Sequence, residues 1–179
     1  MQDPLQNSEV VFLIGYRCTG KTTVGRLLAK RLGWTFLDLD EVLEERQGQT
    51  IRSLFERHGE AGFRHMETAL LEEICRLRQH VIATGGGAIL DPKNRECLRG
   101  SGQVAWLAAD PRTVWHRLQN DPATADRRPN LTQGGLEEIE QLLCLREPFY
   151  RECADCTVNT ANRSPEEAAS LILTHLNLG

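Results

Sequence analysis

The sequence GYRCTGKTT, residues 15–23, follows the apolar run VVFLI at residues 10–14. Its two glycines are separated by four residues, and Lys21 and Thr22 follow the second glycine, which is the spacing of a phosphate-binding loop. A helix that begins near the lysine offers unpaired N–H groups and the positive end of its dipole to an anion. The alternative is a strand–helix turn that matches by chance, but a strand-like run before the motif and an amphipathic run after it favour a nucleotide triphosphate site.

The residue types in this phosphate loop (residues 15–23) suit the contacts that a nucleotide needs. Glycine lets main-chain N–H groups approach an anion closely. Lys21 supplies a positive charge for the β- and γ-phosphates, and the Thr22 hydroxyl is a ligand for Mg²⁺. We therefore expect a group of loop residues to contact ATP: Gly15, Arg17, Cys18, Thr19, Gly20, Lys21, Thr22 and Thr23.

Length and composition limit the other possibilities. A chain of 179 residues with 40% hydrophobic content is expected to form one domain over residues 1–179. No stretch reaches the ~20 apolar residues of a membrane span. Residues 1–9 are polar and lack the basic, apolar and small-residue order of a targeting signal. The net charge is −4 and the basic residues are scattered, so the sequence gives no support for a nucleic-acid partner. We expect a monomer.

Six cysteines occur in the chain. Cys153 and Cys156 form a CxxC pair, but neither a second pair nor a nearby histidine completes a zinc set. The alternative to an incidental pair is a redox or metal motif. We interpret all six as reduced thiols in a cytoplasmic protein, and we expect Cys18 to be exposed enough to react with alkylating reagents.

Strand-like and helix-like segments alternate along the chain, which predicts an α/β three-layer fold with a five-stranded parallel sheet flanked by helices. The predicted strands are residues 10–14, 34–37, 81–84, 104–107 and 157–158. The predicted helices are residues 22–32, 40–47, 51–58, 60–77, 92–99, 111–119 and 136–152, with Pro148 expected to interrupt the last of these, and a final helix opening at 164–167. Residues 120–135 are polar and long for a connection, so they are either a functional lid or disordered.

Three motifs follow the first three predicted strands. The phosphate loop follows the first, Asp38 and Asp40 the second, and the glycine run (Gly85, Gly86 and Gly87) the third. Ligands of open α/β sheets bind at the carboxyl ends of the strands. We therefore expect the three motifs to open onto the same edge of the sheet.

Asp38 and Asp40 are two residues apart at a strand end, so we expect them to share a face. A phosphoryl transferase needs one carboxylate near Mg²⁺ and another near the attacking hydroxyl. The alternative is that Asp40 only caps the next helix and Asp38 is a solvated loop acid. The neighbouring phosphate loop favours the catalytic interpretation.

Further candidates are glycines and arginines. Three consecutive glycines indicate a close backbone approach to a ligand rather than a plain turn. Arg64 and Glu67 lie three residues apart on one predicted helix, and Arg146 lies on another. One interpretation is a surface ion pair of Arg64 with Glu67 and a solvated Arg146. The other is that Arg64 and Arg146 together hold a substrate carboxylate. Arg128 in the predicted lid either stabilises a transferring phosphoryl group or has no role.

Five segments resemble motifs of the shikimate kinases in order and spacing, over about residues 10 to 173. They are FLDLD (36–40), GFRHME (62–67), ATGGG (83–87), RP (128–129) and REPFY (146–150). The resemblance implies a small nucleoside-monophosphate-kinase-like domain with a mobile lid. It also implies transfer of the γ-phosphoryl group of ATP to the 3-hydroxyl of shikimate, in aromatic amino-acid biosynthesis.

The resemblance also implies a role for each site residue. Lys21 and Arg128 would contact the phosphates, and Thr22 and Asp38 would hold Mg²⁺. Asp40 would bind the attacking hydroxyl as the candidate base, so Lys21, Asp40 and Arg128 are the catalytic candidates. The substrate ligands would be Asp40, Arg64, Arg146 and the backbone of Gly85, Gly86 and Gly87, while Arg117 and Arg163 would flank the adenine.

Two other functions remain open at this point. Another small-metabolite kinase, such as a gluconate kinase, shares the phosphate loop but has no need for two arginines to bind a carboxylate on a ring. A nucleotide-binding switch that hydrolyses ATP slowly predicts a sizeable exposed apolar surface or an appended domain.

Overall fold

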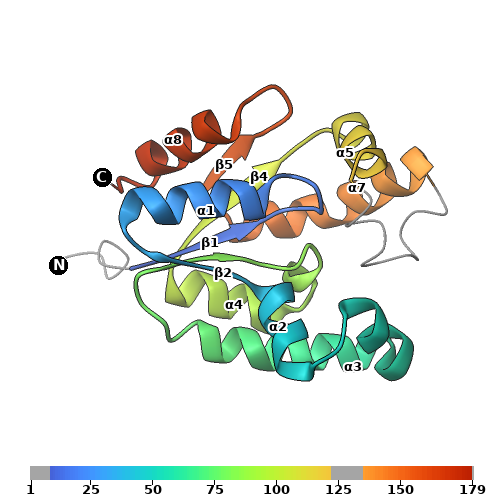
Figure 1. Ribbon diagram of the computed structural model, residues 1–179. Helices are drawn as coiled ribbons and strands as arrows, with labels where there is room; N and C mark the ends of the chain where they lie inside the picture. Colours follow the sequence, from blue (N-terminus) through green and yellow to red (C-terminus); the bar gives the residue numbers. More distant parts are fainter. Residues whose placement is uncertain (1–8, 122–134, 179) are drawn as a thin grey trace.

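The computed structural model describes residues 9–121 and 135–178. Five parallel strands form one sheet in the order β2-β3-β1-β4-β5, which confirms the predicted sheet (Figure 1). The strands are β1 (Val10–Ile14), β2 (Thr35–Asp38), β3 (His80–Ala83), β4 (Gln103–Ala108) and β5 (Cys156–Asn159). The helices are α1 (Lys21–Leu32), α2 (Leu39–Gln47), α3 (Ile51–Ile74), η2 (Ala88–Leu90), α4 (Pro92–Ser101), α5 (Pro111–Gln119), α7 (Gly135–Cys153) and α8 (Pro165–His175).

Strand β1 lies at the centre of the sheet, and all five of its residues are buried. Its residues alternate between two hydrophobic clusters, as the two-residue period of a strand requires. Val11 and Leu13 pack with α1 and α8 on one face. Phe12 and Ile14 pack with α2, α3, α4 and α7 on the other. The helices therefore cover both faces, and Figure 1 shows α1 and α8 together on one side of the sheet.

Local signals account for most helix ends. Helix α1 ends at Gly33, which has φ 70° and donates its N–H to the Ala29 carbonyl. Gly59 has φ 68° and ψ 179° inside α3, so the segment consists of two helices divided at this glycine, as its position in the sequence predicts.

Helix α7 does not break at Pro148, so that prediction was wrong. Proline removes one backbone hydrogen bond, here the bond to the carbonyl of residue 144. Cys144 is exposed, so water can satisfy this carbonyl on the solvent side of the helix.

The carboxyl ends of β2, β3 and β1 lie side by side, because Asp38 pairs with Ala83 and Leu13 pairs with Ala83 from the other side. These are the three strands that the candidate motifs follow. Most of the predicted lid, with Arg128, lies outside the described residues. No helix among residues 9–121 and 135–178 combines the length and apolar character that crossing a membrane requires.

Candidate functional site

The phosphate loop is held together by its own carbonyl groups. The Lys21 ammonium donates to the carbonyls of Gly15, at 2.9 Å, and Tyr16, at 2.8 Å. The Thr19 hydroxyl also donates to the Tyr16 carbonyl, at 2.8 Å. Gly20 is the N-cap of α1, with φ 93°, and no side chain caps the helix there. The first N–H groups of α1 therefore receive no hydrogen bond from an N-cap side chain. This geometry is suited to an anion.

Gly15 has a steric reason to be glycine. Its φ is 141°, and a Cβ atom here would lie 2.3 Å from the carbonyl oxygen of Leu107 in β4. The phosphate loop therefore begins in close contact with β4. A side chain at position 15 would push the loop away from that strand.

Thr22 of α1 and Asp38 at the end of β2 are hydrogen-bonded to each other. The Thr22 hydroxyl donates to Asp38 Oδ2 at 2.8 Å, and Asp38 Oδ1 accepts from the Asp40 N–H at 3.1 Å. Asp38 is thus the last residue of β2 and the N-cap of α2. Asp40 belongs to the first turn of α2, so the prediction that the two aspartates share a strand face was wrong, and so was the alternative in which Asp40 is the cap.

The oxygen atoms of Thr22 and Asp38 fit a magnesium ion. Mg²⁺ prefers oxygen ligands and is usually held by one or two protein groups together with water and phosphate oxygens. Within the described ranges, no cluster of three or more His, Cys, Asp or Glu residues could form a closed metal cage. The pair next to the phosphate loop therefore fits a cation that shares its shell with a nucleotide.

Arg64 and Glu67 form an ion pair on α3, with Nη1 of Arg64 2.6 Å from Oε2 of Glu67. Only 1% of Glu67 is exposed, so the alternative of a surface pair was wrong. The guanidinium also packs against the glycine run, because a Cβ on Gly87 would lie 2.4 Å from Nη2 of Arg64. The ion pair with the buried Glu67 therefore holds Arg64 beside the glycine run at the carboxyl end of β3.

Arg146 reaches the glycine run from α7, which covers the same face of the sheet as α3. It is 8% exposed, and its Nη1 donates to the Gly86 carbonyl at 3.3 Å. The hydroxyl of Tyr150, one turn further along α7, donates to the same carbonyl at 2.6 Å. The alternative of a solvated arginine was therefore wrong for Arg146.

The glycine run also touches the phosphate loop. A Cβ on Gly86 would lie 3.4 Å from both the backbone nitrogen of Arg17 and the carbonyl oxygen of Gly15. The run thus connects the loop to Arg64 through Gly87 and to Arg146 through Gly86. The structure therefore brings the three motifs to one edge of the sheet, as their positions after the first three predicted strands indicate.

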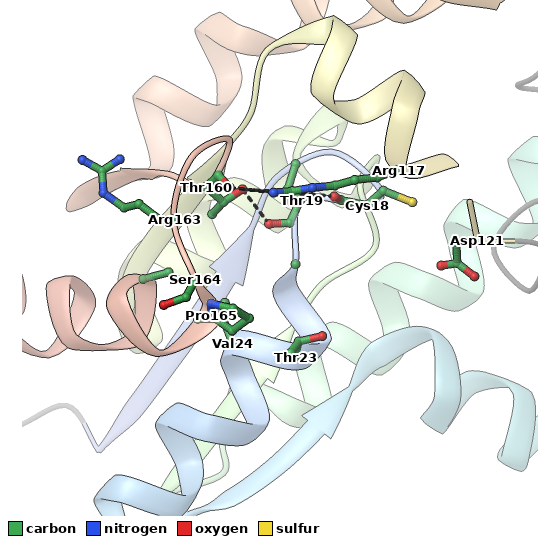
Figure 2. A pocket seen from close by; sticks show the side chains of 12 residues that line it. Cys18, Thr19, Thr23, Val24, Arg117, Asp121, Thr160, Arg163, Ser164 and Pro165 are labelled. Atoms are coloured by element: carbon green, nitrogen blue, oxygen red, sulfur yellow. Dashed lines mark hydrogen bonds between the residues drawn. The ribbon is translucent and has the colours of Figure 1, made fainter. Parts of the chain in front are cut away.

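A pocket of about 330 Å³ opens on the other side of the phosphate loop (Figure 2). Arg117 of α5 crosses it, donating to the Cys18 carbonyl at 3.1 Å and to the Thr160 carbonyl at 2.6 Å. Arg163 lies at its β5–α8 side and donates to the Asn159 carbonyl at 2.7 Å. Both arginines thus line the same pocket as Cys18, Thr19 and Thr23.

Several residues of this region carried no signal in the sequence. The Thr160 hydroxyl donates to the Thr19 carbonyl at 3.0 Å and so fastens the phosphate loop to the end of β5. Asn94 and Arg95 at the start of α4 donate to the Ala88 and Ile89 carbonyls, both at 2.9 Å. They hold η2, the turn that follows the glycine run.

The six cysteines are free thiols. Burial raises the pKa of Cys153 and of Cys156 to about 11 each. An activated CxxC pair needs a lowered thiol pKa, so these two residues lack the property of a redox motif.

Comparison with known proteins gives a consistent result. The family model for shikimate kinase matches residues 17–177. A shikimate kinase from Rhodopirellula baltica is 42% identical over 174 residues, covering 94% of this chain and 93% of that protein. The structure of a shikimate kinase from Acinetobacter baumannii in complex with shikimate is similar, with a TM-score of 0.86, 38% identity, and coverage of 95% and 93%. A gluconokinase from Sinorhizobium meliloti has a TM-score of 0.62 at 18% identity, covering 95% and 92%, which shows a shared fold alone.

Proposed function

The chain belongs to the shikimate kinase family, and we propose that it transfers the γ-phosphoryl group of ATP to the 3-hydroxyl of shikimate. The observation that carries the proposal is the glycine run, which touches the phosphate loop at Gly86 and the Arg64 guanidinium at Gly87. One short segment thereby joins a nucleotide-binding loop to two arginines that can hold a carboxylate.

On the nucleotide side, Lys21 exchanges its two carbonyl partners for oxygens of the β- and γ-phosphates. Loop N–H groups and the start of α1 bind the same phosphates. Arg117 and Arg163 flank the adenine in the pocket that they line. Arg128 lies outside the described residues, and its contact with the transferred phosphoryl group stays a prediction.

On the acceptor side, Arg64 and Arg146 bind the carboxylate of shikimate. A guanidinium has five N–H donors, so each arginine can bind a carboxylate and keep its contact with Glu67 or Gly86. Backbone groups of Gly85, Gly86 and Gly87 face the ring hydroxyls. The acceptor is thereby oriented before reaction, and this orientation lowers the entropic part of the barrier.

In the transfer step, the 3-hydroxyl oxygen of shikimate bonds to the γ-phosphorus as the bond from that phosphorus to the bridging oxygen of ADP breaks. Asp40 orients the hydroxyl and takes its proton. Thr22 and Asp38 hold Mg²⁺, which supplies positive charge to the phosphate oxygens. The products are shikimate 3-phosphate and ADP.

We further propose that residues 1–179 act as a single domain and as a cytoplasmic monomer, without a nucleic-acid or membrane partner. The net charge of −4 with scattered basic residues supports the absence of a nucleic-acid surface. A nucleotide switch predicts a sizeable exposed apolar surface. Against it, the exposed large hydrophobic residues in the described part of the chain are Leu90 and Leu145.

A coupled assay of ADP release tests the proposed activity. We expect release with Mg-ATP to depend on shikimate and to stay at background with gluconate or nucleoside monophosphates. Chelation of Mg²⁺ is expected to abolish release, and added Mg²⁺ to restore it. Release that needs no acceptor, or that needs gluconate, would overturn the proposal.

A further inference from the structure

Tyr16, the second residue of the phosphate loop, is an aromatic residue that no part of the proposed chemistry uses. It is 1% exposed and packs with Val114 and Leu118 of α5 and Ile139 of α7. The guanidinium carbon of Arg146 lies 5.4 Å from the centroid of its ring. This is the distance of a cation–π contact.

The backbone of Tyr16 has a second connection. Its carbonyl oxygen accepts from the Lys21 ammonium and from the Thr19 hydroxyl, both at 2.8 Å. One residue therefore touches the lysine of the nucleotide side through its carbonyl and the arginine of the acceptor side through its ring.

We propose that Tyr16 is a positioning residue whose ring orients Arg146 toward the acceptor carboxylate. The inference rests on the proposed function, because it assigns Arg146 to the carboxylate of the acceptor.

Among residues 9–121 and 135–178, the hydrogen bond that Arg146 makes to the glycine run is too long to fix the guanidinium alone. Its hydrogen bond to the Gly86 carbonyl measures 3.3 Å, at the weak end of the usual range. Arg146 is 8% exposed, so little water competes with the ring for the charge. A cation–π contact is stronger when it is desolvated. The ring of Tyr16 thus restrains the position of the guanidinium that must meet the two carboxylate oxygens.

Two substitutions separate the ring from the hydroxyl. The Tyr16 hydroxyl has no hydrogen-bond partner among the described residues, so Tyr16→Phe is expected to keep the shikimate KM of the parent. Tyr16→Leu removes the aromatic face and is expected to raise that KM by about 2- to 30-fold, which corresponds to the usual range of a cation–π contact. The guanidinium carbon of Arg17 lies 5.8 Å from the centroid of the same ring, so the KM for ATP is measured in both variants. It is expected to rise less than the shikimate KM, because the Tyr16 carbonyl that holds Lys21 is retained.

The control is Val114→Ala, which removes a buried neighbour of Tyr16. It loosens the same cluster but leaves the ring in place, so it is expected to lower the melting temperature without changing the shikimate KM. A series of increasingly fluorinated phenylalanines at position 16 adds a direct measure, since fluorination weakens the negative face of the ring at nearly constant shape. We expect the shikimate KM to rise with each added fluorine.

The outcomes are distinct. A shikimate KM that does not change along the fluorinated series, or in a folded Tyr16→Leu variant, overturns the role of Tyr16. If the leucine variant does not fold, the fluorinated series decides alone. A parent enzyme without shikimate-dependent ADP release overturns the proposed function instead, before any variant is compared.

Discussion

Gly87 and Arg64 are in such close contact that no side chain fits between them. A Cβ on Gly87 would lie 2.4 Å from Nη2 and 2.8 Å from the guanidinium carbon of Arg64. The third glycine of the run is therefore explained by the arginine that it supports, in addition to any approach to a ligand.

Gly87→Ala is expected to displace the Arg64 guanidinium and raise the shikimate KM by about 5- to 150-fold, the range that corresponds to an overpacking cost of about 1–3 kcal/mol. The KM for ATP should change little. Gly100→Ala in α4 is the matched control, because nothing lies within 4 Å of a Cβ there. Steady-state kinetics with both substrates measures the difference; equal shikimate KM values for the two variants would contradict the assignment.

Arg64→Ala is expected to weaken shikimate binding by about 2–5 kcal/mol, measured as a rise in KM. It should also lower the free energy of unfolding by about 3 kcal/mol, because the Glu67 carboxylate stays buried without this cation. Urea unfolding measures the second effect.

The double variant Arg64→Met with Glu67→Leu separates the two roles of Arg64. Replacing both members of a buried pair by apolar residues is often neutral, so stability should recover while shikimate binding stays lost. Recovery of shikimate binding in the double variant would show that Arg64 acts only through the fold.

Asp40→Asn is expected to lower kcat by roughly 100- to 10,000-fold, the usual contribution of a general base, with little change in ATP affinity. Glu45→Gln on the exposed face of α2 is the control. A parental kcat in Asp40→Asn would mean that the attacking hydroxyl needs no base at this position.

The cysteines are expected to react with a thiol reagent at very different rates at pH 8. With a pKa of about 11, only about one in a thousand Cys153 or Cys156 side chains is a thiolate, so both should react slowly. Because the pKa values of Cys153 and Cys156 are raised, the reactivity of both should grow as pH rises toward 11.

The other cysteines provide the comparison. Cys144 is exposed and should react first. Mg-ATP should protect Cys18, which lines the nucleotide pocket. Peptide mapping by mass spectrometry identifies each site, and fast labelling of the CxxC pair would contradict this.

Most predictions that depend on local chemistry agree with the structure; the exceptions are the interruption at Pro148 and the shared face of Asp38 and Asp40. The strand at Val10–Ile14 and the helix ends at Gly33 and Gly59 follow from apolar runs and from glycine backbone preferences. Convergence of the three motifs follows from the general rule for parallel sheets. These features need no knowledge of distant contacts.

What the sequence could not give depends on packing between distant segments. Whether Glu67 is exposed or buried is decided by how α3 meets the sheet. The hydrogen bond from Thr160 to Thr19 joins residues 141 positions apart. The contact of Tyr16 with Arg146 likewise joins the first loop to α7. No periodicity or spacing marks such pairs.

The strand order has a consequence for how the molecule opens. The phosphate loop is attached to β1, which is buried and flanked on both sides, whereas Asp38 and α2 are attached to β2, which pairs with β3 alone at the sheet edge. Amide hydrogen exchange should therefore be slowest in β1 and faster in β2. A partly opened molecule with β2 and α2 detached would keep the phosphate loop but lose Asp38 and Asp40, so damage by heat or denaturant should remove turnover before it removes nucleotide affinity.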